Sequence, residues 1–160
     1  MDDRTFRKAM GHFATGVTVI TTALHGNVHG MTANAFMSLS MDPKLVVISV
    51  DEQAHMLEKI KESGKYAVNI LSAEQQDLSM NFAGQRKTEE EIPFQTVKGV
   101  PVIEGALAQV TCEVAREYVE GDHTLFIGKV TDVHLEENEP LVFYKGKYRT
   151  LSAVEETVKN

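Results

Sequence analysis

A long predicted hairpin near the C-terminus constrains the fold more than any other feature of this sequence. In residues 110–115, Val110, Cys112 and Val114 alternate with smaller or polar residues, and a second extended stretch runs from 123 to about 135. Side chains of a strand point to opposite faces in turn, so both stretches predict strands, and Glu120-Gly121-Asp122 predicts the tight turn between them. Val130 falls out of step with the apolar positions around it, which predicts either a β-bulge or burial on both faces at this point.

The remaining segments predict short strands separated by turns and a few helices. The N-terminal segment predicts a helix capped by Asp3, with Phe6, Met10 and Phe13 on one face and Gly16 as the residue after its end. Further strands are predicted at 17–22, 28–35, 44–50, 66–71 and 141–144, and helices at 54–62 and from the capping box at Ser72 through Phe82. The strand at 44–50 is a nearly continuous apolar run, which is typical of a strand covered on both faces. Strands at this spacing favour an antiparallel barrel over a parallel sheet.

Charge and cysteine content exclude several classes of function. The net charge of −7 argues against nonspecific nucleic-acid binding, which needs a basic surface. No apolar run approaches the ~18 residues of a membrane span, and the acidic start Met1-Asp2-Asp3 does not resemble a signal peptide. The single cysteine, Cys112, lies in an apolar alternation where a thiol is buried and inert, and it excludes an internal disulfide. We therefore expect a cytoplasmic protein with no membrane or nucleic-acid partner.

The segment 30–40 is the strongest candidate for a binding surface. It has no charged residue, and Ala33 and Ala35 leave the backbone open to close approach by a ligand. If the segment were continuously extended, Thr32, Asn34, Ser38 and Ser40 would share one face. Such a row of neutral hydrogen-bonding groups suits a planar heterocycle, a polyol or a phosphate. An ordinary solvated strand edge is the alternative, and the residues alone do not choose between the two.

Motifs for other kinds of site are missing from the sequence. There is no G-x-G-x-x-G and no G-x-x-x-x-G-K-[ST], so neither a Rossmann turn nor a P-loop is predicted. His25 and His29 have a ligand-like spacing, but they fall in a predicted turn, and no metal site is expected.

Five ordered blocks of residues nevertheless resemble one known family. They are 16–21, 30–38, Asn81-Phe82-Ala83-Gly84, 121–128 and Gly146-Lys147-Tyr148, and the likeness extends from about Phe6 to Tyr148. This pattern resembles the short-chain flavin reductase family, and within it the small reductase component of two-component phenol hydroxylases. The resemblance implies a mainly β protein with a few helices, folded as a split, antiparallel, Greek-key β-barrel of the flavin-binding type. It also implies a single domain over 1–151, a C-terminal tail over 152–160, and a homodimer.

The same resemblance implies an activity and a set of site residues. The implied protein is an NADH-dependent (or NADPH-dependent) flavin reductase that passes hydride to FAD or FMN and supplies diffusing reduced flavin to a large oxygenase component that hydroxylates a phenol. The matching blocks place His123 beside the flavin and the nicotinamide, as the candidate catalytic residue. The implied flavin- and nicotinamide-contacting residues are Thr32, Ala33, Asn34, Ala35, Phe36, Ser38, Ser40, Ser49, Val50, Met56, Lys59, Phe82, Ala83, Gly84, Gln85, His123, Lys147 and Tyr148.

Two other functions stay open at this point. An electron-transfer flavoprotein of the same fold would hold FMN permanently without turnover of NADH. A binding module would use the same groove for another heterocycle. The choice between FAD and FMN, and between a held cofactor and a passing substrate, is also open.

Overall fold

A computed structural model describes residues 1–154 of the chain, so residues 155–160 of the predicted tail lie outside the described residues. The elements in chain order are α1 Asp3–Met10, β1 Thr15–Gly16, β2 Thr18–Leu24, β3 Asn27–Ala33, β4 Phe36–Met41, β5 Lys44–Asp51, α2 Met56–Ser63, β6 Lys65–Ile70, η1 Ala73–Gln75, α3 Gln76–Phe82, β7 Phe94–Val97, β8 Val100–Ile103, β9 Ala108–Glu120, β10 His123–Leu135, β11 Val142–Tyr144 and β12 Lys147–Arg149.

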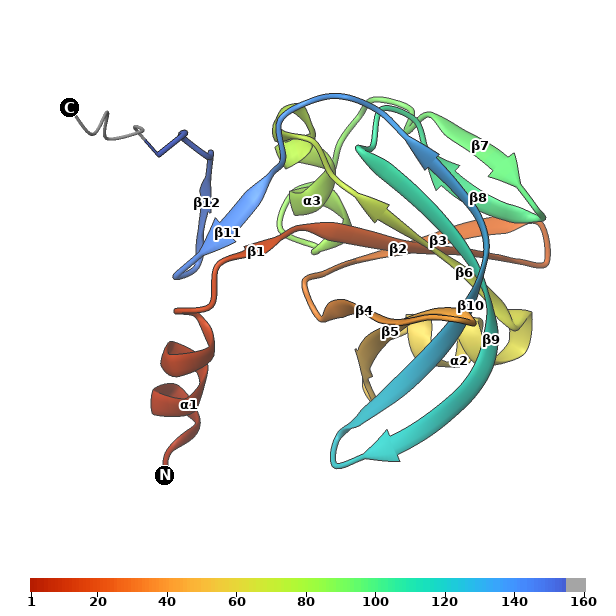
Figure 1. Ribbon diagram of the computed structural model, residues 1–160, viewed down its shortest axis with the longest axis horizontal. Coiled ribbons are helices and arrows are strands. Elements are labelled where there is room, and N and C mark those ends of the chain that lie inside the picture. The colour runs from red at the N-terminus through yellow and green to blue at the C-terminus, as the bar shows by residue number, and fades with distance from the viewer. Residues whose placement is uncertain (155–160) are drawn as a thin grey trace.

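A seven-stranded antiparallel sheet in the order β3-β2-β6-β9-β10-β5-β4 forms the body of the protein (Figure 1). The long hairpin β9–β10 confirms the prediction from the sequence, with a positive φ of 61° at Gly121 in its turn. The ladder shifts register between Val130 and Asp132, which confirms the predicted bulge. A second shift, between Ile127 and Gly128, was not predicted.

Two smaller sheets complete the β structure. β1, β11 and β12 form one, and β7 and β8 form the other. β7, β8 and β12 were not predicted from the sequence, and neither was the break between β3 and β4. β8 lies fully buried, with Val100 and Val102 packed against Ala67 of β6. The missed strands have three or four residues each, which is too short an alternation to predict, and Pro101 also interrupts β8.

The main core lies between the large sheet and α2. Its largest side chain, Tyr66, is fully buried and donates its hydroxyl to the carbonyl of Phe126 over 3.3 Å. Cys112 is buried beside it, and burial raises the pKa of the Cys112 thiol to about 12. The expectation of a buried, inert thiol is therefore confirmed. Gly128 has no side chain because a Cβ there would collide with the Tyr66 hydroxyl.

The N-terminal helix differs from its prediction at both ends. Asp2, not Asp3, is the N-cap, and its side chain accepts a hydrogen bond from the amide of Thr5 over 2.6 Å. The helix ends at Met10 with Gly11 as its cap, and Gly16 belongs to β1, where Thr15–Gly16 pairs with Val142 and Phe143 of β11. The prediction of Gly16 as a helix stop was wrong because the apolar spacing continues to Phe13 beyond the last helical turn.

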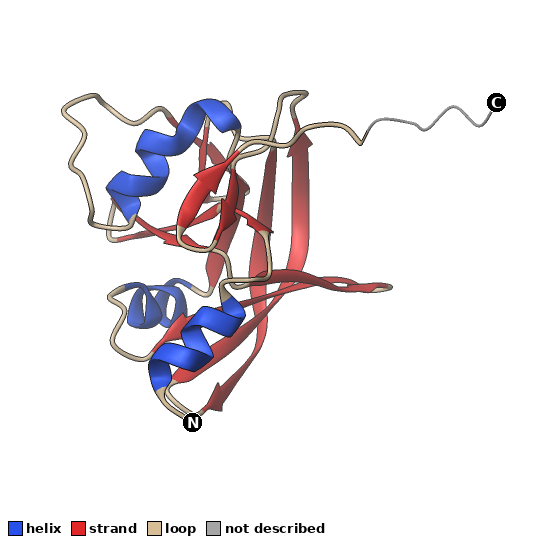
Figure 2. Ribbon diagram, turned by 90° about the vertical axis from the view of Figure 1, so that its left-hand side faces the viewer, coloured by secondary structure: helices blue, strands red, loops and turns tan. Residues whose placement is uncertain are grey.

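The other helices agree with the sequence. α2 turns Met56, Leu57 and Ile60 into the core and ends at Gly64, which has a φ of 67°. Ser72 and Gln75 form the predicted capping box before α3. Figure 2 shows the helices gathered on one side of the molecule and the long strands on the other. No helix within residues 1–154 is long and apolar enough to cross a membrane.

Candidate functional site

Two hollows in the surface meet at Asn34. The smaller has a volume of about 190 Å³ and is lined by Val17, Thr32, Ala33, Asn34, Ser79, Ala83, Gln85, Phe143 and Tyr148. The larger has a volume of about 420 Å³ and is lined by Met10, Phe13, Thr15, Asn34, Ala35, Phe36, Met37, Val47, Ile48, Ser49 and Leu125. The segment 32–36 therefore forms a wall shared by both.

The shared wall is a break between two strands. β3 ends at Ala33, whose carbonyl accepts the Thr18 hydroxyl over 2.7 Å, and β4 begins at Phe36. Between them the Phe36 amide donates to the carbonyl of Asn34, and the Ala35 carbonyl accepts from the Ser49 amide over 3.1 Å. Asn34 and Ala35 are exposed. The bare backbone predicted from the small residues is thus present at the surface.

The predicted single face of Thr32, Asn34, Ser38 and Ser40 is wrong. The predicted strand 28–35 stops two residues early, and the β4–β5 ladder shifts register between Ser38 and Ser40. Either interruption alone ends a period-two alternation. Ser38 and Ser40 lie on β4 and line neither hollow.

Hydrogen bonds join three elements around the smaller hollow. The Thr32 hydroxyl of β3 donates to the carbonyl of Ser79 in α3 over 2.6 Å, and the Ser79 and Tyr148 hydroxyls are hydrogen-bonded at 2.7 Å. The Tyr148 ring packs edge-on against Phe143, with 5.4 Å between ring centroids. This hollow is therefore a slot between a strand end, a helix and an aromatic hairpin.

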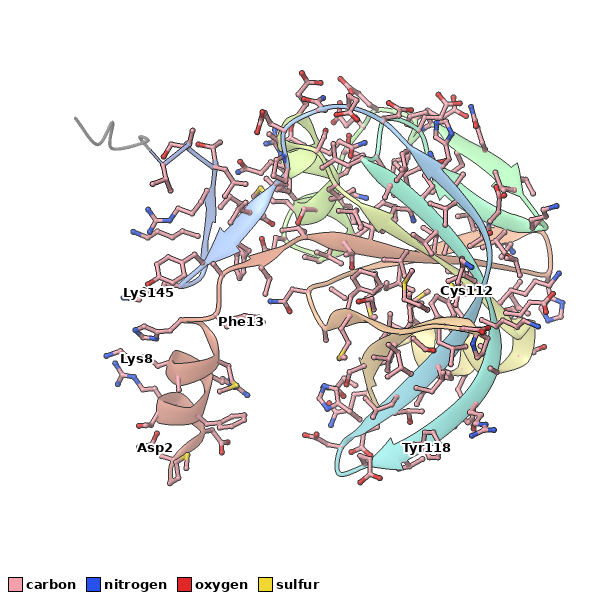
Figure 3. All side chains as sticks on the ribbon, viewed as in Figure 1. Asp2, Lys8, Phe13, Cys112, Tyr118 and Lys145 are labelled. Atoms are coloured by element: carbon pink, nitrogen blue, oxygen red, sulfur yellow. The ribbon has the colours of Figure 1, made fainter. Side chains whose placement is uncertain are left out.

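The larger hollow is mostly apolar and lies between α1 and the β4–β5–β10 part of the sheet. Figure 3 shows Phe13 on the side of α1 that faces the body and Lys8 on the outer side. Within residues 1–154 no side chain of α1 is buried. Of the predicted apolar face, Phe6 and Met10 lie on α1 whereas Phe13 lies beyond its end, and all three side chains are exposed. Val47 and Ser49 on this side of β5 are only half-buried, so the prediction of a strand covered on both faces was wrong for the single chain.

His123 lies at the edge of the larger hollow. Leu125 of β10 pairs with Ser49 of β5, and both line the hollow; His123 pairs with Asp51, one step further along the same face. The His123 side chain is 41% exposed, and its Nδ1 lies 2.7 Å from Oδ1 of Asp122. This hydrogen bond holds the pKa of the Asp122 carboxyl below its ordinary value. His123 therefore lies at a rim, with one ring nitrogen engaged by the carboxylate.

The other predicted site residues lie outside the two hollows. Val50 and Met56 are core residues, with exposures of 0% and 3%, so their side chains face the interior. Lys59 is half-buried on α2 beside His29, and together with burial it lowers the pKa of that histidine. Phe82 packs over Gly30, and Gly84 and Lys147 are exposed next to lining residues.

Several lining residues were not predicted. Val17, Ser79 and Phe143 line the smaller hollow; Met10, Phe13, Met37, Val47 and Leu125 line the larger one. Each belongs to an apolar or capping pattern that is equally consistent with a core position. Only Ser79, a hydroxyl on a largely apolar helix face, carried a signal that could have been used.

The largest hollow, about 560 Å³, is poorly suited to an anionic nucleotide. It lies under the loop 85–93 and is lined by Glu74, Asp77, Glu89, Glu90 and Glu91 among others. Arg86 is paired with Asp77 over 3.2 Å. Five carboxylates against two cations repel a phosphate, so we assign the ligand to the hollows at Asn34. No group of three or more His, Cys, Asp or Glu in the described chain could hold a metal.

The lining chemistry of the two hollows fits a flavin. An isoalloxazine needs a flat slot, hydrogen bonds to its polar edge and apolar contact on its faces. Asn34 and Ala35 are exposed, and because their carbonyls already accept from the Phe36 and Ser49 amides, their own amides and the Asn34 side chain are the groups that offer hydrogen bonds to a ligand. The small side chains of Ala33 and Ala35 leave room for close approach. Phe36, Leu125 and Ile48 offer apolar contact.

Comparison with known proteins shows which family the chain belongs to. Residues 10–152 match the family described as flavin reductase like domain. An NADH-dependent flavin reductase from a Rhodococcus species is 45% identical over 148 residues, covering 91% of this chain and 84% of that protein. The reductase component of 4-hydroxyphenylacetate 3-monooxygenase from Thermus thermophilus is 40% identical, covering 91% and 95%. The solved structure of flavin reductase PheA2 in its native state superposes with a TM-score of 0.93 at 61% identity, covering 96% of this chain and all of that one.

Proposed function

This chain belongs to the flavin reductase like family, and we propose that it is an NADH-dependent flavin reductase that supplies reduced flavin to a partner monooxygenase. The fold is the split barrel of that family, as the resemblance implied. The observation that carries the proposal is the surface break at 32–36, where uncharged, exposed backbone joins an aromatic slot to an apolar hollow.

The chain's contribution to the reaction is chiefly binding and orientation. A flavin held at these hollows would supply the hydride acceptor for a reduced nicotinamide and the electron carrier for the oxygenase. Hydride transfer depends on holding the two rings close and parallel, and acid or base catalysis contributes less. The backbone of Asn34 and Ala35 fixes the polar edge of the flavin, and the aromatic pair Phe143–Tyr148 walls one side.

His123 acts at the edge of the bound rings. Its position one residue pair beyond Leu125 and Ser49 puts the imidazole at the mouth of the larger hollow. With Nδ1 engaged by Asp122, Nε2 is the nitrogen left to face a ligand. In the neutral ring Nδ1 carries the proton that is donated to Asp122, so Nε2 accepts a hydrogen bond, for example from the N–H of the nicotinamide amide, and so helps hold the reacting pair.

The phosphate of the flavin is assigned to Lys59, with Ser38 and Ser40 as neutral donors. Lys59 is half-buried on α2, and its charge acts on His29 of β3, whose pKa is lowered by burial and then by this lysine. This assignment comes from the resemblance and from the charge of Lys59.

The protein works as a homodimer. Within the described chain, the apolar side chains of α1 are not buried against any other element. Met37, Leu39 and Met41 on the edge strand β4 are also exposed. An exposed sheet edge with apolar side chains is a surface that proteins normally cover. A second copy related by a two-fold axis is the commonest cover, and it would also close the open side of the larger hollow.

The partner oxygenase hydroxylates a phenol. The Thermus relative is named as a component of a monooxygenase acting on 4-hydroxyphenylacetate, which is itself a phenol. Reduced flavin reaches the oxygenase mainly by diffusion.

An NADH oxidation assay with and without added FAD or FMN tests the proposed function. Turnover that depends on added or bound flavin is expected. A yellow protein without NADH turnover would instead be an electron-transfer flavoprotein, and a colourless inert one would be a binding module for another heterocycle. Flavin released on denaturation identifies the bound form, and a parallel assay with NADPH identifies the preferred nicotinamide.

A further inference from the structure

The Tyr148 ring separates two hollows. On one side lies the slot of about 190 Å³ described above, and on the other a hollow of about 430 Å³ lined by Ala73, Gln76, Leu141, Tyr148, Arg149 and Thr150. Tyr148 is the one residue that lines both. The position of the Tyr148 ring therefore defines one end of the flavin slot.

One side-chain hydrogen bond holds the Tyr148 hydroxyl. Its partner at 2.7 Å is the hydroxyl of Ser79, which is fully buried in the first turns of α3. Phe143 packs edge-on against the Tyr148 ring but leaves the ring free to tilt. A contact between two aromatic rings is less directional than a hydrogen bond. The hydroxyl pair is thus the directional restraint on Tyr148.

Ser79 is itself fixed from the opposite side. Its carbonyl accepts the Thr32 hydroxyl over 2.6 Å, and Thr32 begins the segment that walls both hollows at Asn34. The same residue of α3 is therefore tied to β3 through its backbone and to β12 through its side chain. The distance between the two long walls of the slot is set at this one position.

The slot is small for a ligand. Sites for small molecules and cofactors usually measure roughly 300–1,000 Å³, whereas this slot measures about 190 Å³. In so narrow a space a tilt of the Tyr148 ring changes the fit of a flat ligand, and a large tilt opens the slot into the neighbouring hollow.

We infer that Ser79 is a positioning residue for flavin binding: its hydroxyl fixes Tyr148 as the end wall of the slot. Ser79 does not touch the reacting atoms. It acts through Tyr148 on the affinity for the flavin ring, with little effect on the chemical step. The inference rests on the proposed function only for the identity of the ring.

A double-mutant cycle tests this inference. Ser79→Ala and Tyr148→Phe each remove one hydroxyl of the pair, and the double variant removes both. We expect each single change to weaken FMN or FAD binding by about tenfold, the usual scale for one lost hydrogen bond. The double variant should bind no more weakly than either single one, because all three lose the same bond. The expected loss is in the flavin Kd, measured without NADH, at a thermal unfolding midpoint that stays near that of wild type, whereas a merely structural role would lower the midpoint as well.

Ser63→Ala is the matched control. It also removes one hydroxyl from a hydroxyl pair, Ser63 with Thr22 at 2.8 Å, on a part of the chain that lines neither hollow. Its flavin Kd should equal that of wild type. Flavin binding is measured by fluorescence quenching without NADH, and thermal unfolding midpoints are measured for every variant.

Wild-type flavin affinity in both single variants would overturn the inference. So would losses that multiply in the double variant, or an equal loss in Ser63→Ala. If Ser79→Ala does not fold, Tyr148→Phe on the exposed hairpin decides alone, since it keeps the ring and removes only the hydroxyl. A wild-type protein that binds flavin but does not oxidise NADH would refute the proposed function. The binding measurements on the variants would still test the inference about Ser79.

Discussion

Gly30 of β3 lies directly beneath the ring of Phe82, the last residue of α3. A Cβ added at Gly30 would lie 2.6 Å from Cε1 of that ring, closer than a real side-chain atom comes. Phe82 also packs edge-on against Phe94, at 6.4 Å between centroids, and joins the cluster around Val19 and Leu71. The missing side chain at Gly30 therefore lets α3 pack against β3 and bring Ser79 to Thr32.

We predict that Gly30→Ala destabilises the protein and weakens flavin binding together. The added methyl group pushes the Phe82 ring out of place, at a cost of roughly 1–3 kcal/mol in the free energy of unfolding. Urea unfolding monitored by circular dichroism measures the loss. Gly16→Ala is the control, because a Cβ there meets nothing within 4 Å and the φ of Gly16 is not positive. Equal stability of the two variants would contradict the prediction.

Ala35→Leu should weaken flavin binding more than tenfold, about 1.4 kcal/mol, and leave the fold intact. Ala35 is exposed and lines the larger hollow, so a longer side chain blocks the ligand without disturbing the core. Flavin titration of the folded variant measures the change. Ala115→Leu, at an exposed position of β9 outside both hollows, should bind flavin normally. A wild-type affinity in Ala35→Leu would show that this segment does not contact the flavin.

His123→Ala should slow the reductive step and barely affect folding. The side chain is 41% exposed, so the change in unfolding free energy should stay within about 0.5 kcal/mol. Loss of one hydrogen bond to the reacting pair should reduce hydride transfer or NADH affinity by roughly ten- to a hundredfold. Stopped-flow reduction of the flavin-loaded variant by NADH measures both. Wild-type rates and wild-type NADH dependence would make His123 an ordinary hairpin residue.

The pKa of His29 should report on the phosphate at Lys59. Burial, and then the charge of Lys59, lowers the pKa of His29 below its ordinary value of 6.5. Lys59→Gln should therefore raise it part of the way back, as measured by NMR titration of the imidazole. FMN should raise it in the wild-type protein because the phosphate offsets the lysine charge, whereas riboflavin, which lacks the phosphate, should not. If FMN and riboflavin changed the pKa of His29 equally, Lys59 would not be part of the phosphate site.

The same shift predicts the direction of a pH dependence of stability. The pKa of His29 is lower in the folded protein than in the unfolded chain, so folding favours the neutral imidazole. The resulting contribution to the free energy of unfolding is fully present above pH 6.5. This contribution is lost as the pH falls from the ordinary pKa of histidine through the lowered pKa of His29 in the folded protein. His29→Gln should flatten the pH dependence of the urea midpoint in that range, and an unchanged profile would contradict the prediction.

The protein should be a dimer at micromolar concentration by light scattering. Replacing the exposed apolar residues Phe6, on α1, and Phe13, just after it, by Ser should weaken association, since neither packs into the core of its own chain. A monomeric wild-type protein would refute the homodimer.

The sequence predicted elements better than it predicted the site. The β9–β10 hairpin, its bulge after Val130 and the capping box at Ser72 follow local rules and were confirmed. The row from Thr32 to Ser40 was wrong because a strand break and a bulge, both set by pairing with β5, interrupt the alternation. The hydroxyl of Ser79 on a largely apolar helix face was a usable signal, but its contacts with Thr32 and Tyr148, 47 and 69 positions away, could not be predicted. Phe143 could not be found because it is placed by pairing with Thr15 of β1, far away in the sequence.

The order of strands in the large sheet has a consequence for how the protein becomes functional during its synthesis. β10 pairs with β5 across a long stretch of sequence, and β11 and β12 add the aromatic wall last. Pairings between residues so far apart in sequence form late in folding. A nascent chain that ends before Tyr148 therefore cannot close the slot, even when segment 32–36 has long left the ribosome. A chain truncated before β11 would keep segment 32–36 but lack the Phe143–Tyr148 wall of the slot, so its affinity for a flat ligand should fall.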